Sequence, residues 1–155
     1  LLALDGQGAV LLGKVAIANA RLAYADFKEV VASDRFQALK ARGARVQRPL
    51  WASTGTKNKE YSDVLYVEEL IGQHTVNTVP PHTLQAFLDH GRVRNSLEED
   101  LEGARQALAA LEELGIDMDQ VTDELEREGV KAFADAFSGL LGAVDERRRT
   151  FGPGA

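Results

Sequence analysis

The apolar positions in the first part of the chain recur at the spacing of a helix. Over residues 14–32 they return mostly three and four positions apart, which predicts one helix of about five turns. Ser33 and Asp34 have the character of an N-cap for a second, short helix over residues 35–41, and Gly43 follows its end. The first part of the chain is therefore predicted to be mainly helical.

Two short runs further along have the pattern of buried strands. Residues 49–53 form an apolar run, and residues 75–79 are rich in β-branched side chains and stop at Pro80. The connection over residues 54–74 contains a predicted helix at 64–71 and is long enough for a right-handed crossover. The pattern therefore predicts two parallel strands joined by a helix.

The rest of the chain has helical periodicity. We expect breaks at Gly115 and Gly129, and a cap at Asp117 or Asp119. The predicted helices cover residues 81–90, 97–114, 118–128 and 129–149. Two strands cannot make a stable parallel sheet, since such strands are buried on both faces and paired on both edges. We therefore expect the remaining strands to lie outside this sequence.

Composition narrows the function classes. The chain has 155 residues, of which 45% are hydrophobic and 27% are charged, enough for one compact core. No apolar run approaches the roughly 18 residues of a membrane span, so no membrane partner is expected. The absence of cysteine excludes a disulfide scaffold and a thiolate site, and is consistent with a cytoplasmic location. The chain begins at Leu1 and its single methionine is Met118, which suggests processing or a fragment of a longer protein.

Charge is unevenly distributed along the chain. The net charge is −6, with +1 in residues 1–91 and −7 in residues 92–155. The acidic half argues against nucleic-acid binding, which requires a basic face. An anionic ligand is therefore expected in the first half.

Three features of the sequence resemble metal or phosphate sites, but each lacks a residue or a spacing that such a site needs. No metal and no cofactor is therefore expected. The Gly8–Lys14 segment matches a phosphate-loop spacing but lacks the hydroxyl residue that holds magnesium. The three histidines, His74, His82 and His90, have no metal-ligand spacing. Asp117 and Asp119 begin like a calcium loop, but its glycine and its final glutamate are missing.

The loop after the first predicted strand is the strongest candidate site. Ser53, Gly55 and Lys57 combine a hydroxyl, a close backbone approach and a positive charge just beyond a parallel strand. Asn77 ends the second strand at the same expected edge. This arrangement favours an anion such as phosphate, although an ordinary polar loop has the same composition.

Several segments resemble the later part of a transaldolase. The specific ones are 48–58 (RPLWASTGTKN), 61–72 (YSDVLYVEELIG) and 75–80 (TVNTVP), preceded by the helical segments 18–24 (ANARLAY) and 36–39 (FQAL). The resemblance covers about residues 10–150. It implies an α/β fold: the C-terminal portion of a TIM (β/α)8 barrel, with residues 49–53 as strand seven, 75–78 as strand eight, and a helical C-terminal extension.

The resemblance also implies an activity and a division of the chain. Transaldolases transfer a dihydroxyacetone unit between sugar phosphates through a lysine Schiff base, in the non-oxidative pentose phosphate pathway and without a cofactor. Residues 1–91 would supply the last βα units, 92–149 the C-terminal helices of the same domain, and 150–155 a Gly/Pro tail or linker. The Schiff-base lysine and the acid/base carboxylates are expected upstream, so this fragment alone should be inactive.

Four residues take a predicted role at the substrate phosphate. Ser53 and Lys57 match the family's phosphate-binding serine and basic residue, although many members have Arg there, with a shorter spacing from the serine. Asn58 and Asn77 are possible polar contacts. None of the six lysines matches the strand that carries the nucleophile.

Two alternatives remain open at this point. The acidic helices over 97–128 could form a non-catalytic helical interaction module, or the chain could be the transaldolase part of a fusion with another sugar-phosphate enzyme. Substrate preference and oligomeric state do not follow from the sequence.

Overall fold

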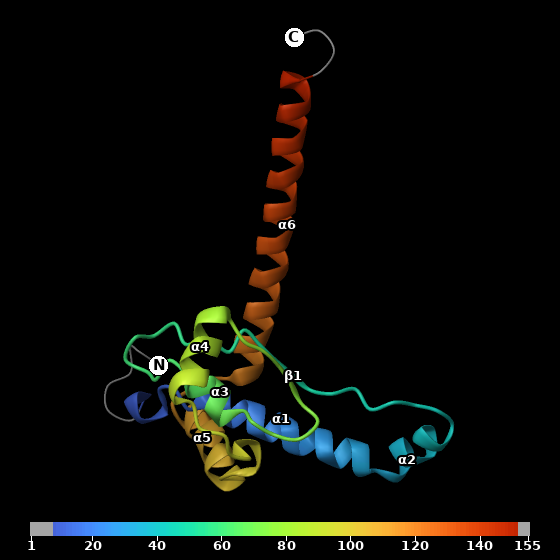
Figure 1. Cartoon of the computed structure of the whole chain (residues 1–155), viewed down its shortest axis with the longest axis vertical. Coiled ribbons are helices and arrows are strands. Elements are labelled where there is room, and N and C mark those ends of the chain that lie inside the picture. Colours follow the sequence, from blue (N-terminus) through green and yellow to red (C-terminus); the bar gives the residue numbers. More distant parts are fainter. Residues whose placement is uncertain (1–7, 152–155) are drawn as a thin grey trace. The chain divides into compact units, whose positions relative to one another are not determined.

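The computed structural model describes residues 8–151, which contain eight regular α- and β-elements and two short 3₁₀ turns (Figure 1). In chain order they are η1 (Gly8–Leu11), α1 (Val15–Ala32), α2 (Asp34–Ala41), β1 (Leu50–Ala52), α3 (Leu65–Glu69), β2 (Val76–Thr78), α4 (Pro81–His90), η2 (Ser96–Glu98), α5 (Leu101–Glu113) and α6 (Met118–Thr150). The chain divides into two compact units, one ending at Ala110 and the other beginning at Leu111.

The two strands pair in parallel, as the sequence predicts. Leu50 lies opposite Val76, Trp51 opposite Asn77, and Ala52 opposite Thr78. Helix α3 lies in the crossover between them. Each strand has three residues, so the pairing is shorter at both ends than the apolar runs suggested.

One face of this two-stranded ribbon is covered and the other is open. Trp51 packs against a buried cluster drawn from α1, the end of α3 and η2: Ile17, Tyr24, Leu70 and Leu97. Because side chains alternate along a strand, Leu50 and Ala52 point to the opposite face. Both are exposed, Leu50 at 52%. The described residues therefore form a helix-covered βαβ piece and do not close a barrel.

The predicted caps are present at two helices. The Ser33 hydroxyl accepts a hydrogen bond from the backbone N–H of Phe36, so α2 begins at Asp34. Of the two candidates at α6, Asp117 is the cap, and its carboxylate accepts from the N–H groups of Asp119 and Gln120. Both caps could be predicted from the sequence because a capping side chain bonds to backbone N–H groups only a few residues away.

Helix α5 begins later than predicted. The expected helix over 97–114 is interrupted by a turn at Asp100, whose φ is +47°. The Asp100 carboxylate accepts a hydrogen bond of 3.0 Å from the N–H of Gly103, so it acts as a cap for α5. The preceding segment is the separate 3₁₀ turn η2.

The predicted break at Gly115 is confirmed, whereas the break at Gly129 is wrong. Gly115 has a φ of +76°, and the N–H of Ile116 bonds back to the carbonyl of Leu111, which closes α5. Gly129 lies inside the continuous helix α6. A single interior glycine costs a helix only about 1 kcal/mol, which a 33-residue helix tolerates.

The C-terminal prediction falls partly outside the described residues. Thr150, the first residue of the expected tail, is the last residue of α6, and positions 152–155 lie beyond the described part. The same holds for positions 1–7 at the start of the chain. Within residues 8–151, no helix combines the length and apolar character needed to cross a bilayer, and no cluster of three potential metal ligands forms.

Candidate functional site

The ends of β1 and β2 lie together, and Ser53 is fixed at this edge. Ser53 directly follows β1 and has a φ of +54°, a left-handed conformation that is unfavourable for a non-glycine residue. Its backbone N–H donates a hydrogen bond of 3.0 Å to the hydroxyl of Thr78, at the end of β2. Ser53 itself is exposed. The strained backbone at an exposed hydroxyl is typical of a functional position.

A second link between the strand ends is buried. The Thr54 hydroxyl donates a hydrogen bond of 2.8 Å to the side-chain oxygen of Asn77. Thr54 is only 5% exposed, so this bond is shielded from water. Asn77 therefore positions the loop after β1, a role that its place on the strand alone did not indicate.

Gly55 allows this loop to lie directly on the first turn of α4. A Cβ atom at Gly55 would stand 3.1 Å from Cγ of Pro80, 3.2 Å from Oγ1 of Thr83 and 3.6 Å from Nε2 of His82. Thr83 is 1% exposed, and its hydroxyl has no partner within residues 8–151. The loop can therefore lie this close to Pro80 and Thr83 because glycine has no side chain.

The two remaining predicted site residues lie further along the same loop. Lys57 is exposed and takes part in no ion pair within the described residues. The Asn58 side-chain oxygen accepts a hydrogen bond of 3.0 Å from the N–H of Glu60, and its carbonyl accepts one from Tyr61. Asn58 thus closes a turn, while Lys57 keeps its charge available to solvent.

A shallow cavity of about 300 Å³ lies beside β1. The loop residues Ser53, Thr54 and Gly55 form part of its wall, and Leu50 and Ala52 contribute from β1. The cavity therefore joins the polar strand end to the open apolar face of the ribbon. It can admit a small molecule whose polar end meets Ser53.

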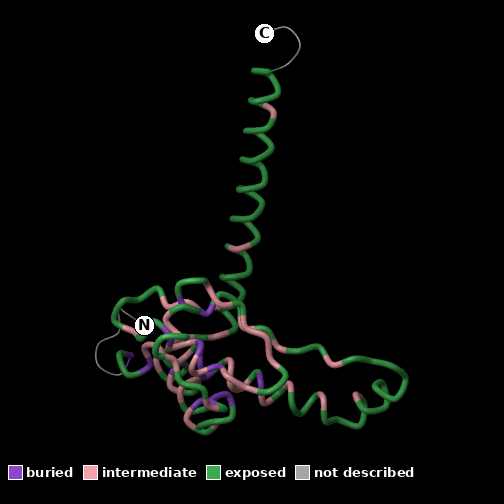
Figure 2. The backbone as a smooth tube through the Cα atoms, in the orientation of Figure 1, coloured by how far each residue is buried: buried purple, intermediate pink, exposed green. Residues whose placement is uncertain are grey.

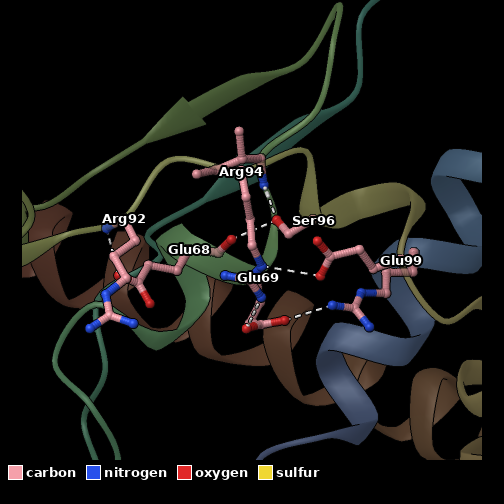
Figure 3. A network of polar contacts seen from close by, with 8 residues as sticks. Glu68, Glu69, Arg92, Arg94, Ser96 and Glu99 are labelled. Carbon is pink, nitrogen blue, oxygen red and sulfur yellow. Dashed lines mark hydrogen bonds and ion pairs between the residues drawn. The ribbon is translucent and has the colours of Figure 1, made fainter.

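Behind this edge, charged side chains hold the crossover helix α3. Glu69 forms an ion pair of 2.6 Å with Arg21 on α1 and a second pair with Arg94, which in turn contacts Glu99 at 3.1 Å (Figure 3). The Arg21 side chain is 11% exposed and that of Glu69 is 23% exposed. The hydrogen bonds that Arg94 donates to Glu69, and then to Glu99, raise the pKa of Arg94 above its usual value, so it stays charged.

Backbone groups complete this anchor. The Ser96 hydroxyl donates to the carbonyl of Glu68 at 2.5 Å and accepts from the N–H of Ile71 at 3.0 Å, while the Glu68 carboxylate accepts from the N–H of Arg92 (Figure 3). Sequence reasoning missed this network because all of its contacts, except that of Arg94 with Glu99, join residues that lie 24 to 48 positions apart. One feature of the sequence could have indicated the network. Glu68 and Glu69 are adjacent on a short predicted helix, and glutamates that become partly buried there need cationic partners nearby.

Comparison with known proteins identifies the family. The model of the Transaldolase/Fructose-6-phosphate aldolase family matches residues 3–144. The chain belongs to this family. It is 44% identical over 154 residues to Transaldolase 2 of Nostoc punctiforme, covering 98% of this chain and 40% of that protein. It is 51% identical over 139 residues to the transaldolase of Mycolicibacterium smegmatis, covering 89% of this chain and 38% of that protein.

This member of the transaldolase family therefore spans about two fifths of the length of these relatives. Its six lysines occupy helices, a helix start and a loop, and none lies on β1 or β2. Those positions are Lys14, Lys28, Lys40, Lys57, Lys59 and Lys131.

Proposed function

We propose that this chain is the phosphate-holding part of a transaldolase. The enzyme would transfer a dihydroxyacetone unit between sugar phosphates, in the non-oxidative pentose phosphate pathway of the cytoplasm. Membership of the family and the relatives that bear the name transaldolase support the activity. One observation above all supports a phosphate-holding role for this chain. At the paired ends of β1 and β2, Ser53 is hydrogen-bonded to β2, and Lys57 follows in the same loop.

Ser53 and Lys57 would bind the substrate phosphate. The exposed Ser53 hydroxyl can donate a hydrogen bond to a phosphate oxygen, and Lys57 adds a positive point charge. Asn77 would act through Thr54, and Asn58 by shaping the turn that follows Lys57. In this arrangement the first two residues contact the ligand, and the two asparagines position the loop.

The chain would form the end of a TIM barrel. Residues 1–91 would contribute its last βα units and residues 92–149 its C-terminal helices. The open edges of β1 and β2 and the exposed Leu50 support this placement, because a parallel strand is normally paired on both sides and covered on both faces. The barrel's other strands would carry the lysine that forms the Schiff base.

Borohydride trapping of the complete gene product tests this function. A Schiff base between a lysine amine and the ketone of fructose 6-phosphate forms with loss of water, and borohydride reduces it to a stable secondary amine. We expect a covalent adduct on a lysine outside the six of this chain. The absence of any adduct would overturn the transaldolase assignment, and an adduct on one of the six would overturn the proposed place of the nucleophile.

A further inference from the structure

An open cavity of about 690 Å³ lies at the amino ends of β1 and β2. Arg48 lines it two positions before β1, and His74 lines it two positions before β2. Because the strands are parallel, Ser53 lies at their opposite ends. Helices α1 and α2 supply most of the remaining wall, and every lining residue belongs to the first compact unit. We call this space the amino-end cavity.

One wall of the amino-end cavity is aromatic. The rings of Tyr24 and Phe27 on α1 stack, with their centroids 6.0 Å apart and an angle of 30° between their planes. The Tyr24 hydroxyl donates a hydrogen bond of 3.0 Å to the carbonyl of Gln73, which holds this ring in place. Val31 and Val46 add apolar surface to the same cavity. A fixed aromatic and aliphatic wall of this kind suits a flat organic group.

The amino-end cavity also has an excess of positive charge. Among the described residues that line it, three are cationic, Lys28, Lys40 and Arg48, and one is acidic, Glu98. Glu98 forms an ion pair of 2.5 Å with Lys28. Lys40 and Arg48 form no ion pair within residues 8–151. Two positive charges therefore remain for an anion.

The sequence around Lys40 and Arg48 adds to this charge. Residues 35–48 contain five lysine and arginine side chains and no aspartate or glutamate, in a chain whose net charge is −6. Figure 2 shows α2 and the segment after it exposed along almost their whole length. Such a local concentration of exposed cations attracts anions to this part of an otherwise acidic chain.

We propose that the amino-end cavity binds a nucleoside monophosphate such as AMP. The base lies against Phe27, which is backed by Tyr24, and the phosphate meets Lys40 and Arg48. The volume of the cavity is within the range of sites that hold small organic ligands. The cavity thus offers one surface for each half of the ligand.

Charge and shape both favour this class of ligand. A phosphate monoester carries about −1.5 to −2 charges at pH 7, which matches the two cations left by the Lys28–Glu98 pair. The planar guanidinium of Arg48 can form two parallel charge-assisted hydrogen bonds with phosphate oxygens. A sugar phosphate has no ring to place on the aromatic wall, and a free base has no charge for Lys40 and Arg48.

Calorimetric titration of the complete gene product with AMP tests the proposal. We expect one AMP for each chain. Adenosine and inorganic phosphate each retain only half of the contacts and should bind at least about tenfold more weakly. Inorganic phosphate that binds as tightly as AMP would overturn the role of the aromatic wall.

Paired variants locate the AMP. Arg48→Gln removes one contacting charge and should weaken AMP binding about tenfold. Arg45→Gln removes the same charge from the same exposed segment, but the described wall of the cavity does not include Arg45, so binding should change less than about twofold. Phe27→Leu keeps the apolar bulk and removes the ring. It should weaken AMP binding about fivefold or more and leave the binding of inorganic phosphate unchanged.

Three further results would overturn the proposal. The absence of saturable AMP binding would show that the cavity holds no nucleotide. Equal losses on Arg48→Gln and Arg45→Gln would mean that AMP is attracted only by the general charge of residues 35–48. A loss on Lys57→Ala with none on Arg48→Gln would place the AMP at the loop after β1. Circular dichroism of each variant checks that the fold is kept.

Discussion

The hydroxyl of Thr54 donates a hydrogen bond of 2.8 Å to the side-chain oxygen of Asn77, and so joins the loop after β1 to β2. The bond is shielded, since Thr54 is 5% exposed. It ties the segment that carries Ser53 and Lys57 to the neighbouring strand, 23 positions away in sequence.

Replacing this hydroxyl should destabilise the chain. Thr54→Val keeps the shape of the side chain but leaves the Asn77 oxygen without its donor, which should cost about 1–2 kcal/mol of unfolding free energy. Urea unfolding of the full chain measures the loss. Thr54→Ser retains the hydroxyl and should lose less. A loss on Thr54→Ser with none on Thr54→Val would mean that packing of the methyl group matters and the hydrogen bond does not.

Adding a methyl group should have opposite effects at two glycines. Gly55→Ala forces a Cβ to within 3.1 Å of Pro80 and 3.2 Å of Thr83, so the loop must shift and unfolding should become easier by about 1–2 kcal/mol. Gly139→Ala lies in the exposed interior of α6 with nothing near its Cβ. It should raise stability by about 0.5–1 kcal/mol. Thermal melts of both variants make the comparison, and a neutral Gly55→Ala would contradict the close packing.

Removing the charge of Lys57 should weaken binding of the phosphorylated substrate. Lys57→Ala in the complete gene product should raise KM for the sugar phosphate about tenfold or more, as expected for one lost charge-assisted contact. Lys59→Ala, two positions along the same exposed loop, serves as the control and should change KM little. Equal effects of the two substitutions would show that overall loop charge matters and Lys57 makes no specific contact.

Neutralising Glu69 should loosen the attachment of α3. Glu69→Gln leaves Arg21 and Arg94 without their shared carboxylate, and we expect a loss of about 2 kcal/mol in unfolding free energy because the Arg21 side chain is largely buried. The exposed pair Lys131–Asp135 on α6 provides a control. Asp135→Asn should cost less than about 0.5 kcal/mol. Similar losses at both sites would mean that the Glu69 network contributes no more than a surface pair.

His90 should make stability depend on pH. The hydrogen bonds that the protonated His90 ring donates to Asp63, and then to Asp89, raise the pKa of His90 above its ordinary value of 6.5. A raised folded pKa means that the stabilisation is fully present below about pH 6.5 and is lost as pH rises through the folded value. The melting temperature of the wild type should therefore fall more between pH 6 and 8 than that of His90→Gln. Parallel curves would show that the pair contributes nothing.

The local elements follow from the sequence alone, and so does the choice of the candidate site. Caps such as Ser33 and Asp117 act within one turn of the helix that they begin, and Gly115 supplies the backbone conformation that ends α5. The two parallel strands also followed from their apolar runs and from the length of the connection. Ser53 and Lys57 could be chosen because ligands bind beyond the carboxyl ends of such strands.

The contacts that hold that site arise only in the folded chain. The contacts of Thr54 with Asn77, of Gly55 with Thr83, and of Glu69 with Arg21 join positions that are 23 to 48 residues apart. Periodicity and capping report on neighbours within a few residues, so they carry no information about such pairs. The positive φ of Ser53 could not be predicted either, and the Thr78 hydroxyl that accepts a hydrogen bond from the Ser53 N–H lies 25 positions away in sequence.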